Sequence, residues 1–131
     1  MVDDPLTRSV IGAAIEVHRN LGPGLLESIY ETCFADELER RGIRFTRQVP
    51  LDIEYKGKRL DGGLRIDLLI EDRVVIELKA VDQVNAVHEA QLLSYMRLAR
   101  KPVGLLINFN VPVLHDGVKR RILSEFLPKS H

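Results

Sequence analysis

Two apolar runs separated by only three residues constrain the fold of this chain more than any other feature. Residues 64–70 and 74–80 each have the length and composition of a strand, and residues 71–73 between them leave room only for a turn. We therefore expect an antiparallel hairpin. Because both runs are apolar over most of their length, we expect them to be central strands of a sheet.

Two helices are predicted ahead of this hairpin. Asp4-Pro5 has the residue types of a helix cap and a first helical position, and apolar residues then recur at helical spacing through Leu21. A second helix is expected over about residues 25–41, because the apolar positions again recur every three or four residues and Gly42 supplies a C-terminal stop.

Short strands are predicted between these helices and the hairpin. Residues 44–49 and 51–55 have strand composition, and glycine-containing breaks follow at residues 56–58 and 61–63. This segment therefore predicts a rhythm of short strands and turns at the start of the sheet.

A further helix and strand follow the hairpin. Helical periodicity returns over about residues 84–100, and Lys101-Pro102 ends it before the apolar run 103–109. The order strand, helix, strand favours a right-handed crossover onto the same sheet. Residues 118–127 fit either a short helix or an extension of the sheet. The predicted fold class is α/β, a mixed central sheet flanked by helices.

Composition limits the setting in which such a chain works. Its 131 residues suit one compact domain over residues 1–131, and no apolar run approaches the roughly 20 residues that span a bilayer, so no membrane partner is expected. The first residues lack a basic and apolar leader, which we take as a natural start without a secretory signal. The single cysteine, Cys33, excludes an internal disulfide and a thiolate zinc site, and it favours a cytoplasmic location.

Charge is balanced overall but unevenly distributed. The 19 basic and 19 acidic residues give no net attraction to a polyanion. Acidic residues dominate 1–39 and 60–96, whereas basic residues dominate 40–59 and 97–131, so a basic rim could surround an acidic centre or simply form a solvated surface. The basic candidates for phosphate contact are Arg44, Arg47, Lys56, Lys58, Arg59, Arg100, Arg120 and Arg121.

Asp67, Glu77 and Lys79 are charged side chains within the hairpin strands, where burying an unpaired charge costs several kcal/mol. Asp67 lies in the first run and Glu77 in the second, and Lys79 shares a face with Glu77 by strand alternation. Taken singly, Asp67 fits a turn cap or a solvent-facing position, and the other two fit a surface ion pair. The two acids can face each other only if 71–73 form a three-residue loop, because a two-residue turn would pair Asp67 with Ile76.

Polar side chains also lie at the start of, or within, the apolar faces of the predicted helices. Glu27 precedes the apolar stripe of the second helix and is either a site carboxylate or a first-turn acid favoured by the helix dipole. Gln91 and Tyr95 on the third helix are either a site pair or a core tyrosine with a supporting amide. The second-helix stripe is Tyr30, Phe34 and Leu38; the stripe expected on the third helix is Val84, Val87, Gln91, Tyr95 and Leu98.

These residues together resemble the PD-(D/E)xK nuclease superfamily. The Glu-x-Lys of 77–79 follows Asp67, and the pair Gln91-x-x-x-Tyr95 looks like that of the RecB-type branch. Residues 24–30, Gly-Leu-Leu-Glu-Ser-Ile-Tyr, are similar to the signature of the GxxExxY family, and further similarity runs through 76–80, 90–95 and 104–109. The proline of the superfamily's name is absent, since Ile66 precedes the aspartate.

The resemblance implies a restriction-endonuclease-like fold and a divalent-metal-dependent nuclease that hydrolyses phosphodiester bonds, in DNA more than in RNA. It implies that Asp67, Glu77 and the main-chain carbonyl of Leu78 bind Mg²⁺ or Mn²⁺, cations that prefer hard oxygen ligands. The resemblance also implies that Lys79 orients the attacking water and that Glu27 holds a ligand water or a second ion. Gln91 and Tyr95 then support the water or the scissile phosphate.

Two other functions compete with a nuclease. One is a catalytically weak module that keeps the nuclease fold and binds nucleic acid or protein as a regulator. The small chain is compatible with that role, or with an enzyme that completes its DNA footprint with a partner or as a homodimer. A metabolic α/β enzyme for a small phosphorylated ligand ranks last, because no glycine-rich phosphate loop is present.

Overall fold

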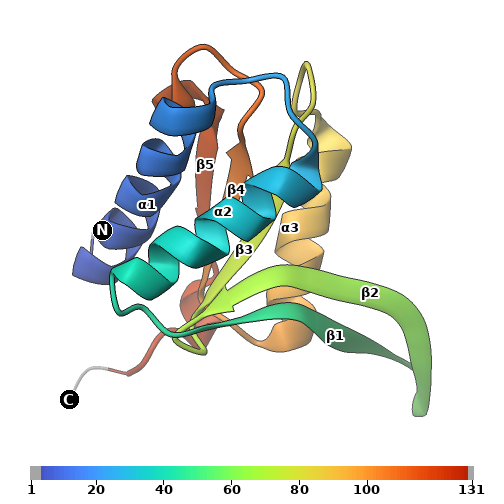
Figure 1. Cartoon of the computed structure of the whole chain (residues 1–131). Coiled ribbons are helices and arrows are strands. Elements are labelled where there is room, and N and C mark those ends of the chain that lie inside the picture. Colours follow the sequence, from blue (N-terminus) through green and yellow to red (C-terminus); the bar gives the residue numbers. More distant parts are fainter. Residues whose placement is uncertain (1–3, 130–131) are drawn as a thin grey trace.

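A central five-stranded sheet organises this chain, whose computed structural model describes residues 4–129 (Figure 1). The elements are α1 (Pro5–Leu21), α2 (Glu27–Arg40), β1 (Phe45–Tyr55), β2 (Lys58–Ile70), β3 (Val74–Lys79), α3 (Ala86–Ala99), β4 (Val103–Asn108) and β5 (Val118–Ile122), with short 3₁₀ turns at Leu114–Gly117 and Ser124–Phe126. The predicted α/β class is confirmed, and of residues 118–127, for which a helix or a strand was open, 118–122 form a strand and 124–126 a 3₁₀ turn.

The strands lie in the order β1-β2-β3-β4-β5, with β3 and β4 parallel and the other neighbours antiparallel. α3 connects the two parallel strands, as the strand–helix–strand pattern predicts. Helices α1 and α2 pack on one face of the sheet around Val10, Phe34 and Leu105, and α3 packs on the other through Leu92 and Met96 (Figure 1). The sheet is therefore covered on both faces over most of its width.

The first two helices are fixed by local contacts that the sequence partly anticipates. Asp4 caps α1, and its Oδ1 accepts a hydrogen bond of 2.7 Å from the Thr7 backbone N–H. The buried Tyr30 of α2 donates its hydroxyl to the carbonyl of Gly22 and stacks on Phe109, with ring centroids 4.5 Å apart. Tyr30 thus fixes where α2 begins. Within residues 4–129, no helix is both long and apolar enough to span a membrane.

β1 and β2 are longer than the predicted short strands. The glycines at 62 and 63 do not end a strand; they form a bulge, because Leu51 pairs with Leu64 whereas Asp52 pairs with Asp61. Gly63 has a φ of +72°, which disfavours any side chain, and a Cβ on Gly62 would lie 2.8 Å from Ile53. The predicted turn at residues 56–58 is confirmed, whereas the turn predicted at 61–63 is wrong, because those residues form a bulge within β2.

The predicted apolar stripe of α3 is wrong at Val87 and Leu98, which are 73% and 38% exposed. The buried face instead centres on Leu92, Tyr95 and Met96. This helix carries apolar residues on several sides, so periodicity alone could not choose the face. Gly104 of β4 helps to decide it, since a Cβ there would overlap Met96 and lie 3.0 Å from Leu92.

Candidate active site

The loop between β2 and β3 sets the relation of the two strand carboxylates. Leu68 pairs with Ile76, Leu69 with Val75 and Ile70 with Val74, so residues 71–73 form the three-residue loop that the site hypothesis requires. Continuing this register places Asp67 opposite Glu77 on one face of the sheet. The predicted odd loop is confirmed.

The regular pairing of β2 with β3 ends at Leu68 and Ile76. At Asp67 and Glu77, hydrogen bonds between a carboxylate and the opposite backbone join the two strands instead. The backbone N–H of Asp67 donates to Oε2 of Glu77 at 3.1 Å, and the backbone N–H of Leu78 donates to Oδ2 of Asp67 at 2.8 Å. Each carboxylate therefore accepts a hydrogen bond from the neighbouring strand. We call Asp67 and Glu77 the acidic pair.

Burial makes the acidic pair costly to ionise. Glu77 is only 5% exposed, and burial followed by the charge of Asp67 raises the pKa of Glu77 to about 8. Burial is also the main cause that raises the pKa of Asp67, although the hydrogen bond from Leu78 opposes it. Two adjacent carboxylates in this setting are stabilised by a cation that neutralises both.

Lys79 is a positively charged side chain that acts on both members of the acidic pair. Its charge lowers the pKa of both members of the acidic pair, but the effect is smaller than that of burial. Lys79 forms no ion pair with either acid in the part of the chain that the structure describes. Its ammonium is therefore not tied to either carboxylate.

Two carboxylates of helix α2 act electrostatically on the acidic pair. The charge of Glu27 at its start raises the pKa of both members of the acidic pair, and Glu31 raises that of Asp67. Glu31 is a residue that our sequence reasoning missed. It lies one helical turn after Glu27, and this i, i+4 spacing on a face directed at the sheet was the available signal.

Glu31 is held by two side chains of β1. Its carboxylate accepts hydrogen bonds from Arg47 Nε at 3.0 Å and from Gln48 Nε2 at 2.9 Å, and its side chain is 12% exposed. Gln48 has a φ of +53°, and the β1–β2 register skips both Gln48 and Asp67 opposite it. A non-glycine residue in this conformation costs about 1–3 kcal/mol, so a strained break in the sheet adjoins the acidic pair.

Gln91 and Tyr95 form a pair on α3. Gln91 Nε2 donates to the Tyr95 hydroxyl at 3.1 Å, with Tyr95 buried and Gln91 half-buried. Glu77 and Lys79 alternate with Val75, which packs in the α3-side core, so their side chains also face α3. The helix pair and the Glu-x-Lys of β3 thus lie on the same side of the sheet.

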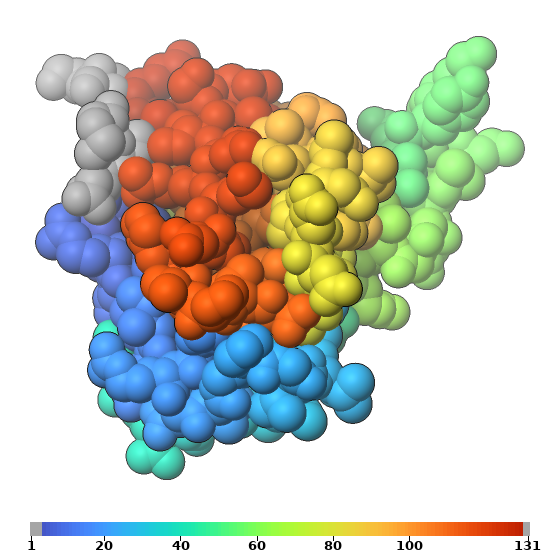
Figure 2. Space-filling model, turned by 90° about the horizontal axis from the view of Figure 1, so that it is seen from above, coloured from blue at the N-terminus to red at the C-terminus, as the bar shows by residue number. Residues whose placement is uncertain are grey.

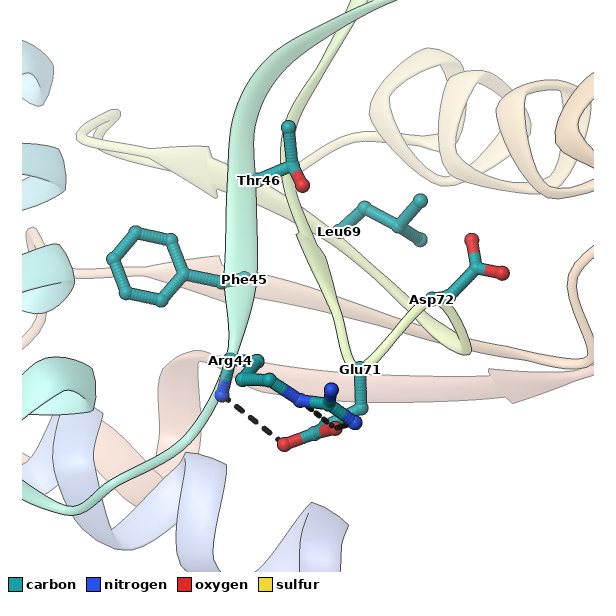
Figure 3. Close-up of a pocket in the computed structure, with 6 residues that line it drawn as sticks. All are labelled: Arg44, Phe45, Thr46, Leu69, Glu71 and Asp72. Carbon is teal, nitrogen blue, oxygen red and sulfur yellow. Dashed lines mark hydrogen bonds and ion pairs between the residues drawn. The ribbon is translucent and has the colours of Figure 1, made fainter.

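A cavity beside strands β1 and β2 lies away from the acidic pair. It has a volume of about 260 Å³ and is lined by residues at the start of β1 and the end of β2 (Figure 3). Glu71 closes it by accepting hydrogen bonds from the Arg44 backbone N–H at 3.0 Å and from its guanidinium. No member of the acidic pair lines this space, so we do not include it in the site.

The comparisons with known proteins bear directly on this arrangement. The family model of the PD-(D/E)XK nuclease superfamily matches residues 4–121, a span that contains the acidic pair, Lys79 and both flanking helices. The chain belongs to the PD-(D/E)XK nuclease superfamily. Its five-stranded mixed sheet agrees with the restriction-endonuclease-like fold expected of that superfamily. Neither the curated proteins nor the solved structures gave a match.

Nucleases of the PD-(D/E)XK superfamily generally use divalent metal ions. Among residues 4–129, no group of three or more His, Cys, Asp or Glu side chains is arranged to hold one. The donor set nevertheless fits a hard cation, because the half-buried Asp67 and the buried Glu77 adjoin the main chain of Leu78, whose carbonyl is a third oxygen. Because burial and the charge of Asp67 raise the pKa of Glu77, a cation bound at this pair would favour its ionised form.

Half of the eight basic candidates for phosphate contact are ion-paired within the chain. These four arginines form ion pairs with acidic side chains, so they present less free charge than the sequence indicates. These pairs are Arg44–Glu71, Arg47–Glu31, Arg59–Asp52 and Arg121–Glu89.

Buried Asn108 at the end of β4 holds the segment that leaves β3. Its Nδ2 donates to the Val81 carbonyl at 2.9 Å, and its Oδ1 accepts from the Val81 N–H at 3.1 Å. Because Asn108 pairs with Lys79 in the parallel register, these bonds fix the chain just beyond the candidate site.

We expect Asn108→Ala to lower the free energy of unfolding by about 2–3 kcal/mol, because both backbone groups of Val81 would lose buried partners. Asn110→Ala is the control, since Asn110 bonds the exposed Asp82 and should change stability by less than about 1 kcal/mol. Urea denaturation measures both. Equal losses in the two variants would contradict the structural role of Asn108.

Proposed function

We propose that this chain is a divalent-metal-dependent nuclease that hydrolyses phosphodiester bonds, with DNA as its substrate. The observation that carries the proposal is a pair of carboxylates on adjacent strands, the half-buried Asp67 and the buried Glu77, each accepting a hydrogen bond from the backbone of the neighbouring strand. A structural ion pair with Lys79 would account for one acid at this point, but it does not account for two, and Lys79 pairs with neither among the described residues. The match to the nuclease superfamily supports the same function.

In the proposed site Asp67, Glu77 and the Leu78 carbonyl would hold Mg²⁺ or Mn²⁺. When bound, such an ion supplies a Lewis acid for the phosphoryl oxygen. Lys79 would donate a hydrogen bond to the attacking water and offset negative charge in the transition state. Glu27 would hold a further water at the start of α2. The Gln91 amide, already bonded to the Tyr95 hydroxyl, would orient the water or the phosphate from the α3 side.

The finer assignment rests on sequence motifs. We infer membership in the GxxExxY family and the RecB-like branch from residues 24–30 and from the pair Gln91 and Tyr95. The single Cys33 supports a cytoplasmic enzyme. A homodimer would give so small a chain a longer footprint on DNA, and sedimentation with and without DNA would test it.

The test is a cleavage assay on linear, supercoiled, single-stranded and branched DNA and on RNA, with Mg²⁺ or Mn²⁺ and with EDTA. We expect metal-dependent cutting of at least one DNA that is lost in Asp67→Ala. Cutting that survives this substitution would place the activity at another site. Absence of cutting with metal binding retained would favour a regulatory module with the nuclease fold.

We expect Lys79→Ala to lower the cleavage rate by about 100-fold or more, because it removes a positioned donor near the developing charge. Lys79→Arg should not restore the rate, since a planar guanidinium cannot replace a compact ammonium. Both rates are measured under single-turnover conditions, and metal binding is followed by the metal-induced rise in Tm.

Lys101→Ala is the matched control for this lysine. Lys101 is also partly buried and pairs with Asp72 at 2.9 Å, in the loop at the far end of β3. Its loss should leave cleavage unchanged. Wild-type cleavage by Lys79→Ala would remove Lys79 from the proposed chemistry.

A further inference from the structure

The hairpin of β1 and β2 extends beyond the rest of the molecule. Residues 52–61 project from the body as a two-stranded arm (Figures 1 and 2). The turn at Lys56-Gly57 is a two-residue turn with positive φ at both positions, and all residues of the arm are exposed except the half-buried Ile53. We call residues 52–61 the arm.

The bulge at Gly62 and Gly63 holds the base of the arm. Gly63 requires its positive φ, Gly62 lies against Ile53, and Asp61 Oδ1 accepts from the Gly63 N–H at 3.0 Å. These contacts set the direction in which the arm leaves the sheet. Its orientation therefore depends on the fold and not on a free linker.

The two faces of the arm differ in chemistry. Directly opposed residues share a face, so one face carries Asp52, Asp61, Glu54 and Arg59, three acids and one base. The other face carries Ile53, Leu60, Tyr55 and Lys58. All the acids of the arm thus lie on one face.

The second face combines an aromatic ring with amines. Tyr55 is 61% exposed and Leu60 is 42% exposed, and Lys56 at the turn places its Nζ 5.3 Å from the centroid of the Tyr55 ring. Lys58 is directly opposite Tyr55 in the register. We call Tyr55, Lys56, Lys58 and Leu60 the aromatic–lysine face.

This face lies on the same side of the sheet as the candidate site. Val49 and Leu51 pack in the α3-side core, and strand alternation carries the same side through Ile53 to Tyr55. Glu77 faces that side too. From Gln48, opposite Asp67, to Tyr55 the strand covers at most about 23 Å, which equals about seven stacked nucleotide steps.

We propose that the aromatic–lysine face binds a single-stranded segment of the nucleic acid that the site cleaves. This proposal rests on the proposed nuclease function. An exposed tyrosine offers a stacking surface that paired bases cannot use, and the two amines match flanking phosphates. The acids on the opposite face repel a polyanion, so the strand is directed to the side on which the site lies. The contact falls within about seven nucleotides of the scissile phosphate.

The test is binding of an oligothymidylate of about 15 nucleotides, long enough to reach from site to arm. Fluorescence anisotropy in EDTA, which prevents metal-dependent cutting, keeps binding separate from cleavage. We expect Tyr55→Ala to weaken this binding about 10-fold or more, with a much smaller effect on a duplex of equal length. Lys56→Ala/Lys58→Ala should weaken it too and lower the salt dependence, log K against log salt, by about 1.4.

Glu54→Gln is the matched control on the opposite face, and its affinity should equal or slightly exceed that of the wild type. The arm residues are exposed, so thermal melting should confirm that every variant folds. Wild-type affinity in the Tyr55 and lysine variants, with cleavage retained, would overturn the arm proposal alone. Failure of the wild type to bind the oligonucleotide also overturns it, and failure to cut any substrate separately overturns the nuclease.

A second copy of the chain is the competing occupant of this face. If Tyr55→Ala converts a dimer to a monomer in light scattering while oligonucleotide binding stays unchanged, the arm is an oligomer contact and the proposal is wrong.

Discussion

Asp67→Asn is expected to lower DNA cleavage by about 1,000-fold or more while the protein stays folded. The substitution keeps an oxygen that can accept the hydrogen bond from Leu78, so the local backbone contact survives. It removes the negative charge needed to hold a divalent cation, whose contribution to the transition state is worth several kcal/mol. Glu77→Gln should act in the same way, since its amide oxygen can still accept from the Asp67 N–H.

The measurement is single-turnover cleavage with saturating Mg²⁺, together with denaturation curves of each variant. Asp36→Asn is the control, because it makes the same substitution on the exposed side of α2, where Asp36 pairs with Arg40 at 2.7 Å. It should cut at the wild-type rate. Loss of activity in Asp67→Asn accompanied by unfolding would not count as support, and full activity would exclude Asp67 from the site.

The second large effect is on the pH dependence of stability without metal. The folded state raises the pKa of Glu77 from 4.5 to about 8, so between these pH values the unfolded chain releases a proton that the folded chain keeps. Stability contributed by this group is therefore complete below about pH 4.5 and falls as pH rises towards 8, by an amount on the order of 4 kcal/mol. The raised pKa of Asp67 acts in the same direction.

Urea denaturation at pH 5.5 and pH 8 in EDTA should reveal this loss in the wild type and a much smaller one in Glu77→Gln. Adding Mn²⁺ should stabilise the wild type more at pH 8 than at pH 5.5, because the metal binds the ionised carboxylates. Parallel pH curves for wild type and Glu77→Gln would contradict the burial of an ionisable pair at this point.

The relation of Asp67 to Glu77 could be predicted from sequence, because it depends only on whether the loop between their strands has an odd or an even number of residues. Once residues 71–73 are taken as the loop, strand alternation alone decides whether Asp67 and Glu77 share a face. The observed register, with Ile70 paired to Val74, meets that requirement. Because this prediction depends only on the number of residues in the loop, small errors in the predicted outer ends of the strands do not change it.

Other features depend on packing or on distant contacts and could not be predicted in this way. The buried face of α3 depends partly on the space that Gly104 leaves for Met96, which belongs to another element. The role of Glu31 depends on Gln48 adopting a strained conformation opposite Asp67. Tyr55 lies in a predicted strand, but its exposure depends on how far the β1–β2 hairpin extends beyond the rest of the molecule, which strand composition does not reveal.

The most direct test of the account is the position of a metal ion. A crystal of the protein grown with Mn²⁺ and measured near the manganese absorption edge should show an anomalous peak between Asp67 and Glu77, roughly 2.0–2.4 Å from their oxygens and from the Leu78 carbonyl. The peak should vanish in Glu77→Gln. A fully active protein whose manganese lies elsewhere, or whose acidic pair binds none, would contradict the account.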